Sequence, residues 1–82
     1  MKDWTIENNN LCKIFYFNTF SEAFAFMTQV AMLCEQQQHH PSWSNTWNRV
    51  EIRLTTHDAG NSITKKDECL ATAIDAIIKI NK

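Results

Sequence analysis

The sequence has few residues that interrupt secondary structure, and it has no long apolar run. Its 82 residues include one glycine and one proline, so helices and strands should occupy most of the chain. No apolar segment approaches the ~20 residues that a bilayer crossing needs, and the first residues lack the apolar core of a signal peptide. We therefore expect one small cytoplasmic domain, spanning residues 1–82, without membrane attachment.

An excess of charge of one sign is also missing. Eight Lys and Arg against nine Asp and Glu leave a net charge of −1, whereas a protein that binds nucleic acid directly normally carries a strong basic patch. The three cysteines are widely spaced and form no C-x-x-C pair, which argues against a disulfide framework or a thiolate metal site. Because Cys12, Cys34 and Cys69 fall in apolar periodic segments, we expect all three to be reduced packing residues.

Hydrophobic periodicity predicts four strands and two helices. The predicted strands span residues 4–7, 11–17, 43–47 and 50–54, and three asparagines form the turn between the first two. Each of two capping boxes, Thr19-x-x-Glu22 and Thr64-x-x-Asp67, precedes apolar residues at helical spacing. The first helix must end before Pro41, because the residue preceding a proline favours an extended backbone.

The order of these elements predicts an α+β fold, with a four-stranded antiparallel sheet and two helices packed on one face. The other face, or an edge of the sheet, would then be free for contact between subunits. The second strand contains the apolar run Ile14-Phe15-Tyr16-Phe17. We therefore expect it to be covered on both faces, by a helix on one side and by a partner chain on the other.

All three histidines fall at junctions between predicted elements. His39 and His40 follow the first helix and precede Pro41, and His57 follows the last strand. Element ends can aim side chains into a cleft, and histidine can donate or accept a proton near neutral pH. If the fold brings the three together, they would form a proton-transfer site without any metal.

Other interpretations of these junctions remain open. The histidines could be solvated or capping residues, or zinc ligands, although no His-x-x-x-His or thiol pair completes a metal shell. Glu35 lies one helical turn before the first histidine, where it could hydrogen-bond a histidine or be solvated. Asp58 adjoins the last histidine, but adjacent strand residues face opposite sides. Trp43 and Trp47 could offer a flat apolar surface to a heterocycle or belong to the core.

The residues around the histidines form a specific pattern. It consists of His39-His40-Pro41-Ser42-Trp43, Trp47-Asn48-Arg49-Val50 and Leu54-Thr55-Thr56-His57-Asp58. Residues of the first predicted helix, from Phe20 to Glu35, and of the last, from Asp67 to Asp75, belong to the same pattern. Through these residues the sequence resembles the pterin-4a-carbinolamine dehydratase family over nearly its whole length.

The resemblance implies the predicted α+β fold, a homodimer or homotetramer, and a cleft that binds a pterin with no metal or organic cofactor. The family's reaction dehydrates 4a-hydroxy-tetrahydropterin to the quinonoid dihydropterin, and it recycles the cofactor that aromatic amino-acid hydroxylases use. The family histidines correspond to His39, His40 and His57. The resemblance assigns the following residues to substrate binding: Glu35, Gln38, Pro41, Trp43, Thr55, Thr56 and Asp58.

These residues suggest acid–base catalysis. A histidinium would protonate the departing hydroxyl at C4a, and a neutral histidine would take a proton from a ring nitrogen. We expect His39 and His57 to be the essential pair, with His40 orienting the ring or serving the opposite stereoisomer. Two departures from the commonest family pattern lie nearby. Gln38 replaces an acid or Asn, and Asn61-Ser62 lengthens the turn after Gly60 by one residue.

Functions from a second class also fit this pattern. The chain could be a pterin-binding module without turnover, or a dimerising or regulatory module with the same fold, since some animal members are dimerisation partners of a homeodomain transcription factor. The intact histidine trio favours the enzyme, because a scaffold has no need of all three.

Overall fold

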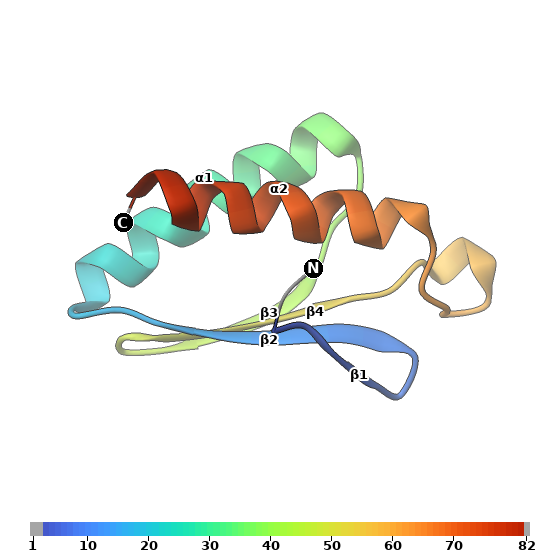
Figure 1. The fold of residues 1–82 in the computed structure, drawn as a ribbon, viewed down its shortest axis with the longest axis horizontal. Coiled ribbons are helices and arrows are strands. Elements are labelled where there is room, and N and C mark those ends of the chain that lie inside the picture. The colour runs from blue at the N-terminus through green and yellow to red at the C-terminus, as the bar shows by residue number, and fades with distance from the viewer. Residues whose placement is uncertain (1–2, 82) are drawn as a thin grey trace.

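The computed structural model describes the backbone of residues 3–81 and the side chains of residues 3–79. Four antiparallel strands form one sheet, and two helices cover one of its faces (Figure 1). The strands are β1 (Thr5–Glu7), β2 (Asn10–Tyr16), β3 (Ser42–Thr46) and β4 (Arg49–Leu54). The helices are α1 (Phe20–Gln37), a short 3₁₀ helix η1 (His57–Ala59) and α2 (Lys65–Asn81). The predicted fold class is confirmed.

The sheet has the order β1-β2-β4-β3, so the two central strands are β2 and β4. A two-residue turn joins β1 to β2, because Glu7 pairs with Asn10 in the register. Asn8 and Asn9 both have positive φ, +50° and +63°, as the tightest hairpin turns require and as asparagine tolerates. The turn is therefore one residue shorter than the sequence predicts, and Asn10 belongs to β2.

The core lies between the sheet and the helices. Along β4, the alternate side chains of Val50, Ile52 and Leu54 are fully buried, as the period-two pattern predicts. Helix α2 adds Leu70 and Ile74, which are also 0% exposed. Burial of each such side chain contributes roughly 1.5–3 kcal/mol. The core therefore holds β4 and α2 in place, and His57 lies in the segment that connects them.

The outer face of the sheet is open within this chain. Ile14 and Tyr16 alternate with the buried Phe15 on β2, and they are 43% and 63% exposed. Because strand side chains alternate between faces, only the helix-facing half of this apolar run is covered. The helix-covered face of β2 is as the sequence predicts, and the covering of its other face by a partner chain stays a prediction.

The cysteines separate into two kinds. Cys12 and Cys34 are buried, and burial raises the pKa of both thiols. Cys69 is also a free thiol, but it is exposed on α2. The expectation that all three cysteines pack in the core is wrong for Cys69, because its position falls on the solvent side of the helix, next to the buried Leu70.

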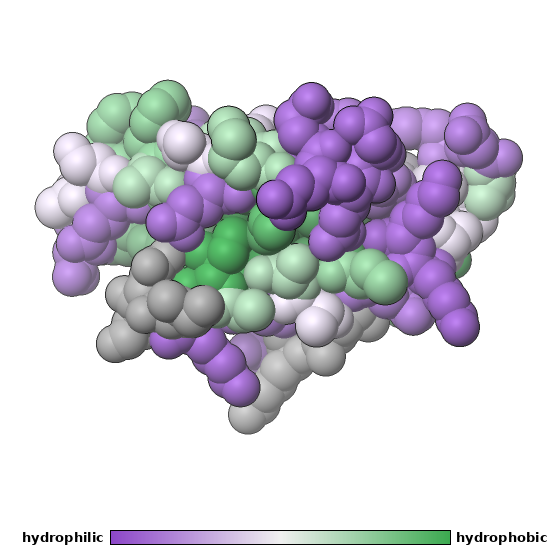
Figure 2. All heavy atoms as spheres, turned by 90° about the horizontal axis from the view of Figure 1, so that it is seen from above, coloured by the Kyte–Doolittle hydropathy of each residue, from purple (hydrophilic) through white to green (hydrophobic). Residues whose placement is uncertain are grey.

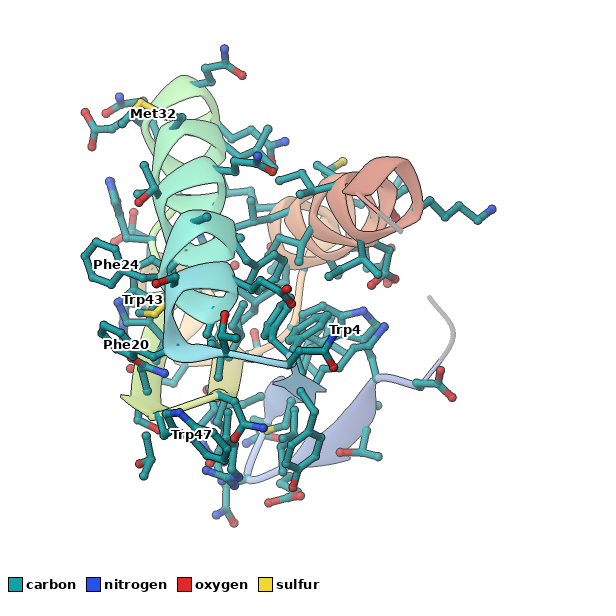
Figure 3. The ribbon with its side chains drawn as sticks, turned by 90° about the vertical axis from the view of Figure 1, so that its left-hand side faces the viewer. Trp4, Phe20, Phe24, Met32, Trp43 and Trp47 are labelled. Carbon is teal, nitrogen blue, oxygen red and sulfur yellow. The ribbon has the colours of Figure 1, made fainter. Side chains whose placement is uncertain are left out.

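Apolar side chains are exposed along one side of α1. Phe20, Phe24 and Met32 are 48%, 56% and 61% exposed, and they project outward on the side of the molecule where Trp47 lies in the β3–β4 turn (Figure 3). Seen from the helix side, hydrophilic side chains gather mostly over the half that carries the start of α2 (Figure 2). Of the helices that residues 3–81 form, neither combines the length and the apolar character that crossing a bilayer requires.

Candidate active site

The three histidines meet where α1 ends, β4 ends and α2 begins. A cleft of about 330 Å³ opens there, within the size range of small-molecule sites. The cleft is lined by Gln38, His39, His40, Pro41, Thr56, His57, Asp58 and Lys66. Residues far apart in the sequence thus form one site, with histidines from two separate junctions.

The end of α1 determines where His39 lies. Gln38 adopts the left-handed conformation, with φ +51°, and its N–H donates to the carbonyl of Glu35 at 3.3 Å. The N–H of His39 then donates to the carbonyl of Cys34 at 3.1 Å. This pair of bonds is the Schellman arrangement that often ends a helix. It reverses the chain so that the His39 side chain turns inward and is only 9% exposed.

A buried carboxylate holds the inner histidine. Asp67, at the start of α2, is 0% exposed, and its Oδ1 lies 2.5 Å from Nε2 of His39. Its Oδ2 accepts from the hydroxyl of Thr56 at 2.7 Å and from the N–H of Thr64 at 2.8 Å. Among the described residues, every buried side-chain nitrogen and oxygen has a hydrogen-bond partner. The carboxylate therefore joins three elements in a fully satisfied network.

The charge of Asp67 is stabilised in spite of its burial. Burial by itself would raise the pKa of this carboxyl, but the hydrogen bonds from His39, Thr64 and Thr56, with the nearby charge of His39, hold its pKa below the ordinary value. The ionised carboxylate therefore places a negative charge directly beside the inner histidine of the cleft.

This lowered pKa predicts how stability depends on pH. Unfolded, the carboxyl of Asp67 titrates near ~3.9; folded, it titrates lower. The contribution of this carboxyl to the free energy of unfolding is therefore fully present above about pH 4. It is lost as the pH falls through the pKa of the folded state, because the unfolded chain then binds more protons. Urea unfolding at pH 6 and pH 3 should show a larger loss of stability for the wild type than for Asp67→Asn. Equal losses in the two proteins would contradict the assignment.

The other two histidines are exposed and have different partners. Nε2 of His40 lies 2.9 Å from Oε1 of Glu35, with side chains 58% and 70% exposed. Glu35 thus contacts a histidine, as one interpretation of the sequence allows, and that histidine is His40. His57 begins η1, and its Nδ1 lies 2.7 Å from Oδ1 of Asn61.

The residues assigned to substrate binding do not all line this cleft. Gln38, Pro41, Thr56 and Asp58 line it. The hydroxyl of Thr56 is already hydrogen-bonded to Asp67 and Thr64. Trp43 lies on the edge strand β3, half-buried against the core, and is not among the lining residues.

Thr55 lies outside the cleft lining as well. Its hydroxyl donates to the carbonyl of Asn9 at 3.0 Å, which ties the end of β4 to the β1–β2 turn. Adjacent strand residues point to opposite sides, so Thr55 turns away from the cleft that Thr56 lines. The two threonines therefore have different roles in the fold.

Three residues of this site were not predicted from the sequence. The sequence predicts Asp67 as the capping acid of the last helix and as part of the family pattern, but not as the partner of His39. Lys66 lines the cleft without having been singled out in the sequence. Asn61 is predicted only as part of a lengthened turn.

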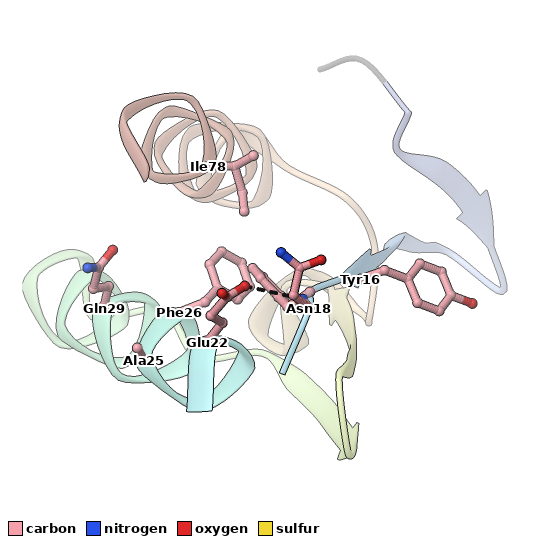
Figure 4. Close-up of a pocket in the computed structure, with 8 residues that line it drawn as sticks. Tyr16, Asn18, Glu22, Ala25, Phe26, Gln29 and Ile78 are labelled. Atoms are coloured by element: carbon pink, nitrogen blue, oxygen red, sulfur yellow. Dashed lines mark hydrogen bonds between the residues drawn. The ribbon is translucent and has the colours of Figure 1, made fainter. Parts of the chain in front are cut away.

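A larger groove of about 520 Å³ lies between the two helices, next to the end of β2 (Figure 4). Phe17, Phe26 and Ile78 contribute apolar side chains to it. Its acid, Glu22, accepts from the N–H of Asn18 at 3.2 Å, one residue before the N–H of the cap residue Thr19 that a capping box would use. The groove is lined by no histidine, whereas all three histidines line the smaller cleft.

Fold and cleft together define a class: a small α+β protein with three histidines grouped at one end of an antiparallel sheet. The family model for pterin 4 alpha carbinolamine dehydratase matches residues 1–77. The chain belongs to this family.

Individual relatives agree with the family assignment. A Synechococcus protein described as a candidate pterin-4-alpha-carbinolamine dehydratase is 54% identical over 74 residues, which cover 90% of this chain and 78% of the relative. A similarly described protein of Rhodospirillum rubrum is 51% identical over 78 residues, covering 93% and 80%. The crystal structure of a Brucella melitensis transcriptional coactivator/pterin dehydratase superposes with a TM-score of 0.87 at 37% identity, covering 93% and 82%.

A more distant structure shares the fold alone. It is a pterin dehydratase-like protein identified as a RuBisCO assembly factor in the alpha-carboxysome, with a TM-score of 0.77 and 23% identity over 90% of this chain and 87% of that one. The fold therefore carries more than one function, and function has to be argued from the site.

Proposed function

We propose that this chain dehydrates a 4a-hydroxy-tetrahydropterin to the quinonoid dihydropterin and water by histidine acid–base catalysis. The observation that carries the proposal is the meeting of His39, His40 and His57 in one cleft, with His39 bonded to the buried Asp67. The relatives' names supply the substrate class, and the cleft is large enough for part of a bicyclic heterocycle.

The reaction needs two proton transfers and no change of oxidation state. Hydroxide is a poor leaving group, so an acid protonates the C4a hydroxyl as the C4a–O bond breaks and water departs. The lone pair of the adjacent ring nitrogen forms the new C=N bond, and a base removes the proton that leaves a ring nitrogen. Each positioned proton transfer typically contributes about 10²–10⁴ in rate.

The partners of the histidines support these two roles. His39 is the acid, because its Nε2 lies against the carboxylate of the buried Asp67, whose negative charge would offset the charge of an imidazolium. His57 is the base, because its partner, the side chain of Asn61, is a neutral amide. His40 is exposed beside Glu35 and orients the substrate at the mouth of the cleft.

The lining residues suggest how a pterin is held. Gln38, Asp58 and Lys66 offer polar groups at the rim, and Pro41 offers an apolar surface. Trp43, Thr55 and Thr56 stay predictions as substrate contacts. A homodimer or homotetramer and a cytoplasmic location also stay predictions.

The test generates the 4a-hydroxy intermediate enzymatically and follows quinonoid dihydropterin by absorbance. Because the intermediate also dehydrates spontaneously, the rate is measured with and without the protein. We expect an acceleration proportional to protein concentration. A folded protein, verified by circular dichroism, that leaves the spontaneous rate unchanged would favour the non-catalytic module instead.

A further inference from the structure

We propose that Asn61 is a positioning residue that fixes the tautomer of His57, so that Nε2 is the nitrogen that accepts the proton. The inference rests on the proposed function in one respect, the role of His57 as the base. Nδ1 of His57 lies 2.7 Å from Oδ1 of Asn61. An amide oxygen only accepts hydrogen bonds, so Nδ1 carries the hydrogen and the neutral ring has its lone pair on Nε2.

The loop that carries Asn61 is held in place by backbone bonds. Asn61 has φ +58°, a conformation that asparagine adopts more readily than other residues with a side chain. On either side of the loop, Thr56 and Ser62 exchange N–H···O bonds of 2.9 and 3.3 Å, and the Ser62 hydroxyl donates to the carbonyl of Ala59 at 2.7 Å. The Asn61 amide is therefore presented to His57 by a closed loop.

This loop is also tied to the acid of the site. Thr56, which closes the loop through its backbone, donates its hydroxyl to Asp67. The other oxygen of the same carboxylate contacts His39. Asp67 therefore holds the acid directly, and it holds the partner of the base through Thr56 and the loop.

The neutrality of this partner matters for the chemistry. A carboxylate beside His57 would favour the protonated ring, and a protonated ring cannot accept the proton. The titratable and charged groups that line the cleft with His57 are His39, His40, Asp58 and Lys66. The Asn61 amide orients the ring without adding a further charge to this set.

Two substitutions separate the effect of orientation from the effect of charge. Asn61→Gly keeps the backbone conformation and removes the acceptor, since glycine readily adopts positive φ. Asn61→Asp keeps the shape and adds a negative charge. Asn18→Asp adds the same charge just before α1, at the opposite end of that helix from the histidines, and serves as the control.

The first measurement is ¹⁵N NMR of histidine-labelled protein, with His57→Gln to assign the His57 signals. For the wild type we expect the neutral His57 ring as the Nδ1–H tautomer, and for Asn61→Gly a shift toward the Nε2–H form. For Asn61→Asp we expect the His57 titration midpoint to move up by roughly half a unit to one unit. Asn18→Asp should leave it unchanged.

The second measurement is the dehydration rate. We expect Asn61→Gly to lower the rate about tenfold with little change in KM. We expect Asn61→Asp to move the acidic limb of the pH–rate profile to higher pH, because the base must be deprotonated to act. A wild-type His57 in the Nε2–H form, or a Gly variant with an unchanged tautomer and rate, would overturn the inference. An inactive wild type with the Nδ1–H tautomer would instead overturn the proposed function.

Discussion

His39→Ala and His57→Ala should each lower the rate of catalysed dehydration by about 10²–10⁴-fold. His39 is held by a buried carboxylate and His57 by a neutral amide, so each variant would remove one of the two proposed proton transfers. The measurement is the protein-dependent rate after subtraction of the spontaneous reaction. Because dehydration proceeds without protein, the loss is complete when the measured rate falls to that background.

His40→Ala is the matched control for these variants. It removes an adjacent histidine whose side chain is 58% exposed and whose partner, Glu35, is 70% exposed. We expect a loss of less than about tenfold, because an exposed orienting contact contributes less than a proton transfer. A series in which only His40→Ala abolishes activity would reverse the assignment of the essential pair.

Asp67→Ala should destabilise the fold by about 3 kcal/mol. The substitution leaves the buried His39 without its charged partner and removes the acceptor of two further hydrogen bonds, from Thr56 and Thr64. Removal of one partner from a buried pair typically costs about 3–5 kcal/mol, and each unsatisfied buried donor adds to the cost. The free energy of unfolding is measured by urea titration, with a check that the slope is unchanged.

Glu35→Ala is the control for this experiment. Glu35 is also a carboxylate paired with a histidine, but both side chains of that pair are exposed. Exposed ion pairs contribute about 0–1 kcal/mol, so the variant should unfold nearly as the wild type does. If Asp67→Ala were as mild as Glu35→Ala, the network around Asp67 would not hold the site together.

The architecture of this protein was predictable because its signals are local. Val50, Ile52 and Leu54 alternate along one strand and are all fully buried. The cap residue Thr19 marks the beginning of α1, and the N–H of Glu22 donates to its hydroxyl. What covers the outer face of β2 is not predictable in the same way, because the run Ile14-Phe15-Tyr16 has no periodicity that separates one buried face from two.

The site was predictable in its histidines and in the candidate partner Glu35, but not in the partners Asp67 and Asn61. Chemistry and spacing single out His39 and His57, but the identity of a hydrogen-bond partner depends on which elements the fold brings together. Asp67 has the sequence signature of a helix cap, and it serves as one, since it accepts from the N–H of Thr64. Its second role depends on His39, 28 residues away in the chain. Asn61 gives no local signal beyond its place in a turn.

The most direct test of the account compares the wild type with the double variant His39→Ala/His57→Ala in one rapid-mixing experiment. Both proteins receive the same freshly generated 4a-hydroxy-tetrahydropterin, and the appearance of quinonoid dihydropterin is followed. The account predicts that the wild type accelerates dehydration and that the folded double variant leaves it at the spontaneous rate. A double variant that still accelerates dehydration as the wild type does would contradict acid–base catalysis by these two histidines.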